Sequence, residues 1–171
     1  RMAVVGVFVL SVVIVVAVAA PWIAPHNPNE QVLERRLLPP AWVEGGTRNH
    51  LLGTDHLGRD ILSRIIYGSR ISLAVGFSAV VISGLLGIAA GLVAGFYGRG
   101  YEATIMRLVD IQLAFPFILL ALAIIGVLGP GLRNVILVLG VAGWMVYARV
   151  VRGQVLSVRE REFVEAARAI G

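Results

Sequence analysis

The stretch LAVGFSAVVISGLLGIAAGLVAGF, Leu73–Phe96, runs for 24 residues without a charged side chain. As an α-helix it would be about 36 Å long, which exceeds the roughly 30 Å hydrocarbon core of a bilayer. Gly87, Gly91 and Gly95 recur every four residues within it and therefore share one helix face. Such a smooth face lets another helix approach closely in lipid. We expect a transmembrane helix that packs against a second helix through this glycine stripe.

Three further apolar segments complete the pattern: Met2–Ala20, Ile111–Leu128 and Val135–Ala148. These runs are continuous rather than alternating, which excludes a transmembrane barrel. The 171-residue chain is 58% hydrophobic with a mean hydropathy of +0.86, values typical of integral membrane proteins. We therefore expect an all-α, polytopic helical membrane protein with four transmembrane helices in this chain. Pro116 should kink the third of them.

The first apolar run has an alternative interpretation as a signal peptide, because Arg1 precedes it and small residues end it. We favour a retained helix, since the run is longer than a usual signal-peptide core and Trp22 resembles an interfacial anchor. Arginines cluster after the fourth segment, which places that side in the cytoplasm by the positive-inside rule. Counting back places residues 25–70 outside, although six arginines in that loop argue against this orientation.

The predicted outer segment has two parts. Residues 25–53 are rich in proline and glycine, which indicates irregular loop. Asp60 is then a plausible N-cap for a short amphipathic surface helix that leads into the second span. Four residues here could suggest a metal site: His50, Asp55, His56 and Asp60. Their spacing matches no zinc pattern, so we interpret them as capping and turn residues and predict no metal site.

Several enzyme classes are excluded by composition. The chain has no cysteine, and all fifteen of its basic residues are arginine, so it lacks a thiol nucleophile, a P-loop lysine and a Schiff-base lysine. No nucleophile, base and oxyanion hole can be assembled, and we predict no catalytic residue. Asp110 is expected to form an interfacial ion pair with Arg107. The net charge of +5 suggests contact with anionic membrane lipids rather than with nucleic acid.

The chain closes on SVREREFVEAARAIG, Ser157–Gly171, a charged and alanine-rich segment. Ser157 and Glu160 have the spacing of a capping box, which predicts the start of a helix. Four residues at helical spacing would form one narrow apolar face: Phe163, Ala166, Ala167 and Ile170. The mixed charges on the opposite face favour docking into a groove of a protein partner over binding to lipid.

The segment EAARAIG, Glu165–Gly171, resembles the opening of the E-A-A-x-x-x-G motif of permease subunits of bacterial ABC importers. The segment LLGTDHLGRDILSRIIYGSRISL, residues 51–73, and residues 113–171 are similar to the dipeptide/oligopeptide/nickel branch of that family. In the family this motif forms a cytoplasmic coupling helix that sits in a cleft of the ATPase subunit. The resemblance thus assigns residues 157–171 to coupling, through four motif positions: Glu165, Ala166, Ala167 and Gly171.

The resemblance also implies an architecture and a set of partners. Family members have six transmembrane helices, so we expect the chain to be a fragment that stops within the motif. We divide it into residues 1–24, the first span; 25–70, the extracytoplasmic loop with its amphipathic helix; and 71–171, the permease core.

The expected partners are cytoplasmic ATP-binding subunits, a second permease subunit and an extracytoplasmic solute-binding protein. ATP would be bound by the partner, so the chain itself needs no cofactor, and the expected location is the bacterial inner (plasma) membrane. Two alternatives stay open: a subunit of a non-ABC transporter or channel, and a membrane scaffold protein. The first would leave the EAARAIG segment as a coincidence, and the second would make the outer loop the active part.

Overall fold

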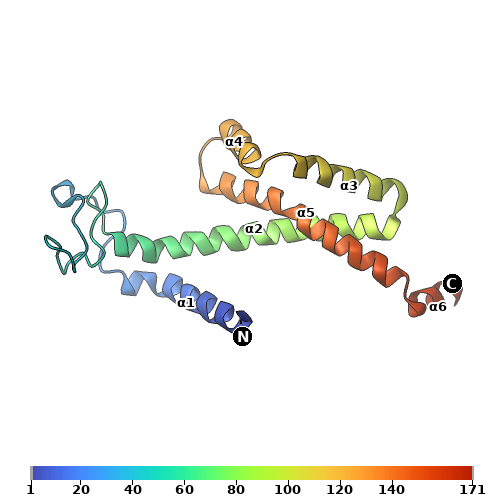
Figure 1. Ribbon diagram of the computed structural model, residues 1–171, viewed down its shortest axis with the longest axis horizontal. Coiled ribbons are helices and arrows are strands. Elements are labelled where there is room, and N and C mark those ends of the chain that lie inside the picture. Colours follow the sequence, from blue (N-terminus) through green and yellow to red (C-terminus); the bar gives the residue numbers. More distant parts are fainter. Residues whose placement is uncertain (1, 171) are drawn as a thin grey trace. The chain divides into compact units, whose positions relative to one another are not determined.

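The computed structural model describes residues 2–170 and confirms an all-α, polytopic membrane architecture (Figure 1). Three helices are long and apolar enough to cross a membrane: α1 (Met2–Ile23), α2 (Ile61–Tyr97) and α5 (Leu132–Arg159). Helices α3 (Arg99–Ala114) and α4 (Phe117–Leu128) form a bent pair. If this pair counts as one span, the number of spans rises to four. The chain divides into two compact units, Arg1–Ala74 and Val75–Gly171.

The first unit contains α1, an irregular loop of residues 24–60 and the beginning of α2. The loop includes one 3-10 turn, η1 (Leu33–Arg35). Backbone hydrogen bonds hold the loop together, because the N–H of Leu37 donates to the carbonyl of Asp55 at 3.0 Å and that of Thr54 donates to Leu38 at 3.1 Å. The loop is irregular, as its prolines and glycines predicted, and backbone hydrogen bonds within it hold its segments together.

Gly58 shows how tightly this loop is folded. Its φ is +73°, a conformation that residues with a side chain rarely adopt. A Cβ atom at this position would lie 2.6 Å from the carbonyl carbon of Val32. Only glycine fits where these two loop segments cross.

The start of α2 corrects one expectation. Asp60 caps the helix as predicted, because its Oδ2 accepts the N–H of Ser63 at 2.7 Å. However, no separate surface helix precedes the second span, since α2 continues without a break from Ile61 to Tyr97. Isolated glycines such as Gly68 do not terminate a helix, and no proline interrupts this segment.

The second unit contains the rest of α2 followed by α3, α4, α5 and α6 (Glu162–Ile170). The third predicted span is not one straight helix, because α3 and α4 meet at an angle of 92°. Pro116 explains the break: it lacks a backbone N–H, and it forces Phe115 into an extended conformation with φ −86° and ψ 129°. The expected kink at Pro116 is thus a complete interruption.

Helix α5 is central to this unit (Figure 1), and it contacts α3, α4 and α6. The buried core consists of Val109, Met145 and Ala148, with Met106 and Trp144 packed against it. The long helix also overturns the predicted capping box. Ser157 lies within the last turn of α5, and the chain breaks only at residues 160–161 before α6 begins.

Candidate functional site

Helix α6 follows the long span α5 after a break of only two residues. It is the most amphipathic of the α-helices, as its predicted apolar face requires. Phe163 and Ile170 on that face are 63% and 89% exposed, respectively. The motif residues Glu165, Ala166 and Ala167 are exposed as well, whereas Gly171 lies outside the described residues. Within residues 2–170 the apolar face of α6 is therefore uncovered.

The end of α5 is tied to the end of α2. Nη1 of Arg159 donates to the carbonyl of Gly95 at 2.7 Å and to that of Phe96 at 3.2 Å. These carbonyls belong to the last turn of α2, where backbone acceptors lack helical partners and carry partial negative charge. One guanidinium group directly before α6 thus caps the C-terminus of a transmembrane helix.

Three polar pairs join α3 to α5: Glu102–Arg152, Asp110–Arg149 and Gln112–Trp144. Nη2 of Arg149 lies 2.6 Å from Oδ1 of Asp110, so the predicted pairing of Asp110 with Arg107 was wrong. Sequence proximity favoured Arg107, but helix packing brings Arg149 closer. The indole N–H of Trp144 donates to Oε1 of Gln112 at 2.7 Å and adds a neutral link between the same helices.

The glycine stripe of α2 faces α5. A Cβ atom added at Gly91 would lie 2.7 Å from both the carbonyl oxygen of Ala148 and Cβ of Val151. At Gly95 the added atom would lie 2.6 Å from Cβ of Val155, and at Gly87 it would lie 2.5 Å from Cβ of Tyr147. Real Cβ contacts are not this short, so the close approach of the two helices depends on glycine.

Sequence reasoning missed the reciprocal positions on α5. A Cβ atom at Gly140 would lie 2.7 Å from Cγ2 of Ile82, and Gly143 lies against Ser83. The hydroxyl of Ser83 donates to the carbonyl of Gly140 at 2.8 Å, which adds a hydrogen bond to the contact. The spacing of Gly140 and Gly143, three positions apart on α5, is the sequence pattern that could have predicted this contact.

The loop of the first unit holds a polar cluster at the start of α2. The four residues considered in the sequence do not gather there: the structure brings His50 and Asp60 together with His26, while the exposed His56 stays apart. Burial raises the pKa of Asp60, but hydrogen bonds from Ser63 and His50 outweigh that effect and hold it below its usual range. Asp60 is therefore ionised at neutral pH.

Asp55 organises the turn before α2. Its Oδ1 accepts the backbone N–H of Leu57 at 2.9 Å and of Arg59 at 3.0 Å, and its Oδ2 pairs with the side chains of Arg59 and Arg64. Burial raises the pKa of Asp55, but these hydrogen bonds and the charge of Arg59 lower it well below its ordinary value. The turn role expected for Asp55 thus rests on an ionised carboxylate.

This turn should lose stability in acid. A folded pKa below the unfolded value means that the stabilisation is present above the unfolded pKa of about 4 and is lost as pH falls toward the folded pKa. We expect Asp55→Asn to speed amide exchange of residues 53–61 roughly tenfold at neutral pH, the equivalent of one charged hydrogen bond. Hydrogen–deuterium exchange, corrected for intrinsic rates, measures this. The pH dependence should shrink but persist, because the pKa of Asp60 is also lowered. Unchanged exchange would contradict the role of Asp55.

Comparison with known proteins places the chain in a family. Residues 87–171 match the family described as binding-protein-dependent transport system inner membrane component. The chain belongs to this permease family. Residues 1–40 also match the N-terminal transmembrane domain of oligopeptide transport permease C. The predicted resemblance to permeases of the dipeptide/oligopeptide branch is therefore confirmed, as is a multi-pass location in the bacterial inner membrane.

Relatives of this permease share sequence along nearly the whole chain. It is 46% identical over 97% of its length to the di/tripeptide transport system permease protein DppC of Pseudomonas aeruginosa. It is 47% identical over 99% to the dipeptide transport system permease protein DppC of Escherichia coli strain K12, and 42% identical over 100% to that of Haemophilus influenzae. The chain spans 55%, 56% and 58% of these relatives, respectively. The family is one of permeases rather than of ATPases. Its description as a component of binding-protein-dependent transport systems favours the importer interpretation over a non-ABC transporter or a scaffold.

Proposed function

We propose that the chain is a transmembrane subunit of an ATP-driven importer and forms half of the translocation pathway for peptides. The names of its relatives support dipeptides, tripeptides or related small solutes as the cargo. A second permease subunit would supply the other half of the pathway. The solute would pass between the two subunits as they alternate between outward-open and inward-open arrangements.

The observation that carries this proposal is the uncovered amphipathic helix α6. Its apolar residues are exposed, and it presents Glu165, Ala166 and Ala167 directly after a membrane span. Small side chains permit close packing, so the helix suits a cleft on a protein rather than a flat surface. We assign that cleft to a cytoplasmic ATP-binding subunit. ATP is bound there, and this chain needs no cofactor of its own.

The coupling route that we propose runs from α6 into the membrane helices. Closure of the ATP-binding subunits displaces α6, which is joined to α5 by residues 160–161. Helix α5 passes the movement to α2 through the glycine contacts and through Arg159. It passes the movement to α3 through the ion pairs at Glu102 and Asp110.

The loop of residues 24–60 is the surface that we propose for contact with an extracytoplasmic solute-binding protein. Its internal hydrogen bonds give it a defined shape, which a recognition surface requires. The three-part division into residues 1–24, 25–70 and 71–171 stays a proposal, and α2 already begins at Ile61, inside its second part. Membrane lipids would surround the apolar helix faces that no protein partner covers.

The test uses the full-length protein as bait for its ATP-binding subunits. We expect it to retain an ATPase after purification in mild detergent, and vesicles containing the complex to accumulate a labelled dipeptide when ATP is supplied. A complex without ATPase and without ATP-dependent uptake would reject the proposal. Facilitated movement without an ATPase would instead support a non-ABC transporter.

The proposed orientation has a direct test, because the chain contains no cysteine. Thr47→Cys and Ser157→Cys each place one thiol at an exposed position, in the loop and at the end of α5 respectively. We expect a membrane-impermeant maleimide to label the Thr47→Cys variant in intact cells, and the Ser157→Cys variant only after the membrane is opened. The reverse pattern would invert the topology and remove α6 from the cytoplasm.

A further inference from the structure

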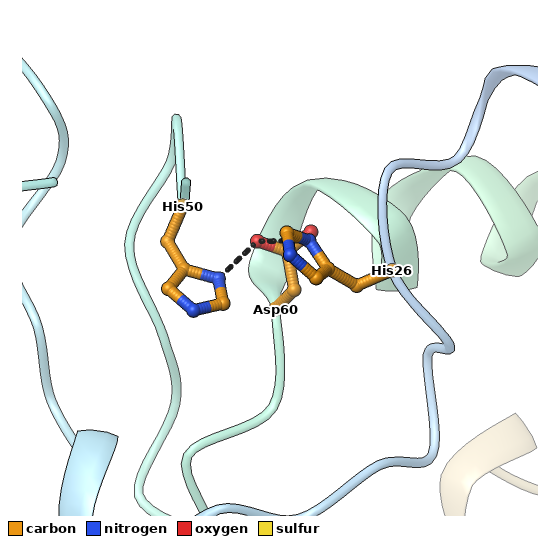
Figure 2. A group of neighbouring side chains, drawn as sticks. All are labelled: His26, His50 and Asp60. Carbon is orange, nitrogen blue, oxygen red and sulfur yellow. Dashed lines mark hydrogen bonds and ion pairs between the residues drawn. The ribbon is translucent and has the colours of Figure 1, made fainter. Parts of the chain in front are cut away.

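Two imidazole groups and one carboxylate converge in the loop of the first unit (Figure 2). His26 follows α1, His50 lies in the middle of the loop, and Asp60 immediately precedes α2. One ligand atom from each residue lies within 4.8 Å of the others. Nδ1 of His50 is 3.0 Å from Oδ1 of Asp60, and Nδ1 of His26 is 3.9 Å from the same oxygen.

Hydrogen bonding within the protein accounts for only part of this arrangement. His50 can donate to Oδ1 of Asp60, but 3.9 Å is too long for a hydrogen bond from His26. Nδ1 of His26 is buried and has no hydrogen-bond partner among the described residues, and the same is true of Nε2 of His50. A buried nitrogen without a partner is costly, so an additional group that binds Nδ1 of His26 would stabilise the loop.

Ser63 orients two of the three residues. Its backbone N–H and its hydroxyl both donate to Oδ2 of Asp60, each at 2.7 Å. Its hydroxyl oxygen also accepts the backbone N–H of His26 at 3.0 Å. Supporting contacts of this kind fix the ligands of metal ions in proteins. The two hydrogen bonds from Ser63 occupy Oδ2 of Asp60 and leave its Oδ1 facing the two imidazoles.

We propose that His26, His50 and Asp60 bind a divalent transition-metal ion of the zinc type. Ligand atoms of a tetrahedral zinc ion lie about 3.3 Å apart, given metal–ligand distances of about 2.0–2.2 Å. The separations of the two imidazole nitrogens from Oδ1 of Asp60, 3.0 Å and 3.9 Å, bracket that value, and the third separation is within 4.8 Å. Two imidazoles with one carboxylate favour zinc and its neighbours over calcium and magnesium, which prefer oxygen ligands.

The surroundings leave room to complete the coordination. A cavity of about 40 Å³ adjoins the three residues, with Glu30 and Arg35 also on its wall. A water molecule needs roughly 10–15 Å³ measured this way, so water can occupy the fourth position of the ion. The bound ion would join the segment after α1, the middle of the loop and the start of α2. Its role would be to fix the shape of residues 26–60.

The test measures Zn²⁺ binding by the full-length protein, purified with a tag that contains no histidine and stripped with a chelator. We expect one Zn²⁺ per chain and a higher unfolding temperature when Zn²⁺ is added. Mg²⁺ and Ca²⁺ should not compete. Zinc-edge X-ray absorption should show only nitrogen and oxygen ligands, at about 2.0–2.1 Å.

Substitution separates this site from adventitious binding. His26→Gln and His50→Gln should each weaken Zn²⁺ binding by more than about 100-fold, since changes to supporting residues alone cost about 10–100-fold. His56→Gln is the matched control, because His56 is exposed in the same loop and lies outside the cluster.

Three outcomes would overturn the proposal: no Zn²⁺ binding by the unmutated chain, equal loss in the His56→Gln variant, or effective competition by Mg²⁺. The unfolding temperature and X-ray absorption of the unmutated protein decide the question even if a variant fails to fold.

Discussion

Gly91→Leu is expected to separate α2 from α5 and to abolish transport by the full-length protein. Even a Cβ atom at this position would lie 2.7 Å from the carbonyl oxygen of Ala148 and from Cβ of Val151. Neither neighbour can move away easily, because one belongs to the helix backbone and the other is the branch point of a stiff side chain. Overpacking typically costs about 1–3 kcal/mol, and a clash with backbone should exceed that range. The measurements are unfolding temperature in detergent and ATP-dependent uptake in vesicles.

Gly84→Leu is the matched control on the same helix. A Cβ atom at Gly84 meets nothing within 4 Å, so the same substitution should leave the unfolding temperature of this chain nearly unchanged. Gly91→Ala should give a smaller loss than Gly91→Leu, since it adds only one atom to the contact. If Gly91→Leu and Gly84→Leu behave alike, the glycine stripe does not position α2 on α5.

The second large effect is expected at α6. Ala167→Trp and Glu165→Arg should weaken binding of the ATP-binding subunit and remove ATP-driven uptake, while membrane levels of the protein stay normal. Both positions are exposed in this structure, so neither change disturbs packing within the chain. In a docked helix, however, the added ring would overpack the contact by about 1–3 kcal/mol, which corresponds to roughly 5- to 150-fold weaker binding. The inverted charge would face the partner unpaired.

Retention of the ATPase in a pull-down is the primary measurement for these variants. Glu44→Arg is a matched charge reversal at an exposed loop position, and Arg48→Ala is a second control in the same loop. Both controls should keep the ATPase at the unmutated level. If Ala167→Trp and Glu165→Arg also keep it and sustain uptake, α6 is not a coupling helix.

The sequence predicted the helical architecture well because lipid leaves few alternatives. A continuous apolar run of membrane length must satisfy its backbone hydrogen bonds internally, so Met2–Ala20 could be placed within a few residues of α1. The glycine stripe was also readable, since spacing along a helix fixes which residues share a face. These inferences needed only local periodicity.

The errors arose where non-local packing decides between local alternatives. Ser157 and Glu160 fit a capping box, but α5 continues through Ser157 to Arg159, whose side chain bonds to the end of α2. Pro116 predicted a kink, but the size of the bend between α3 and α4 depends on how α4 packs on α5. His26 lies 24 residues before His50 in the sequence, and only the folding of the loop brings the two rings to a centroid distance of 4.7 Å.

The bond from Arg159 to the end of α2 has a mechanical consequence. A helix that is joined to its neighbour only by a flexible linker can move before the neighbour is displaced. Here the guanidinium of Arg159, three residues before α6 begins, donates to the carbonyl of Gly95 at 2.7 Å, so α5 and α2 are joined directly next to α6. We therefore expect a displacement of α6 to move the C-terminal end of α2 at once, without a lag. Arg159→Gln should weaken this connection between α5 and α2. In the full-length protein we expect ATP hydrolysis to continue while the number of solute molecules transported per ATP falls.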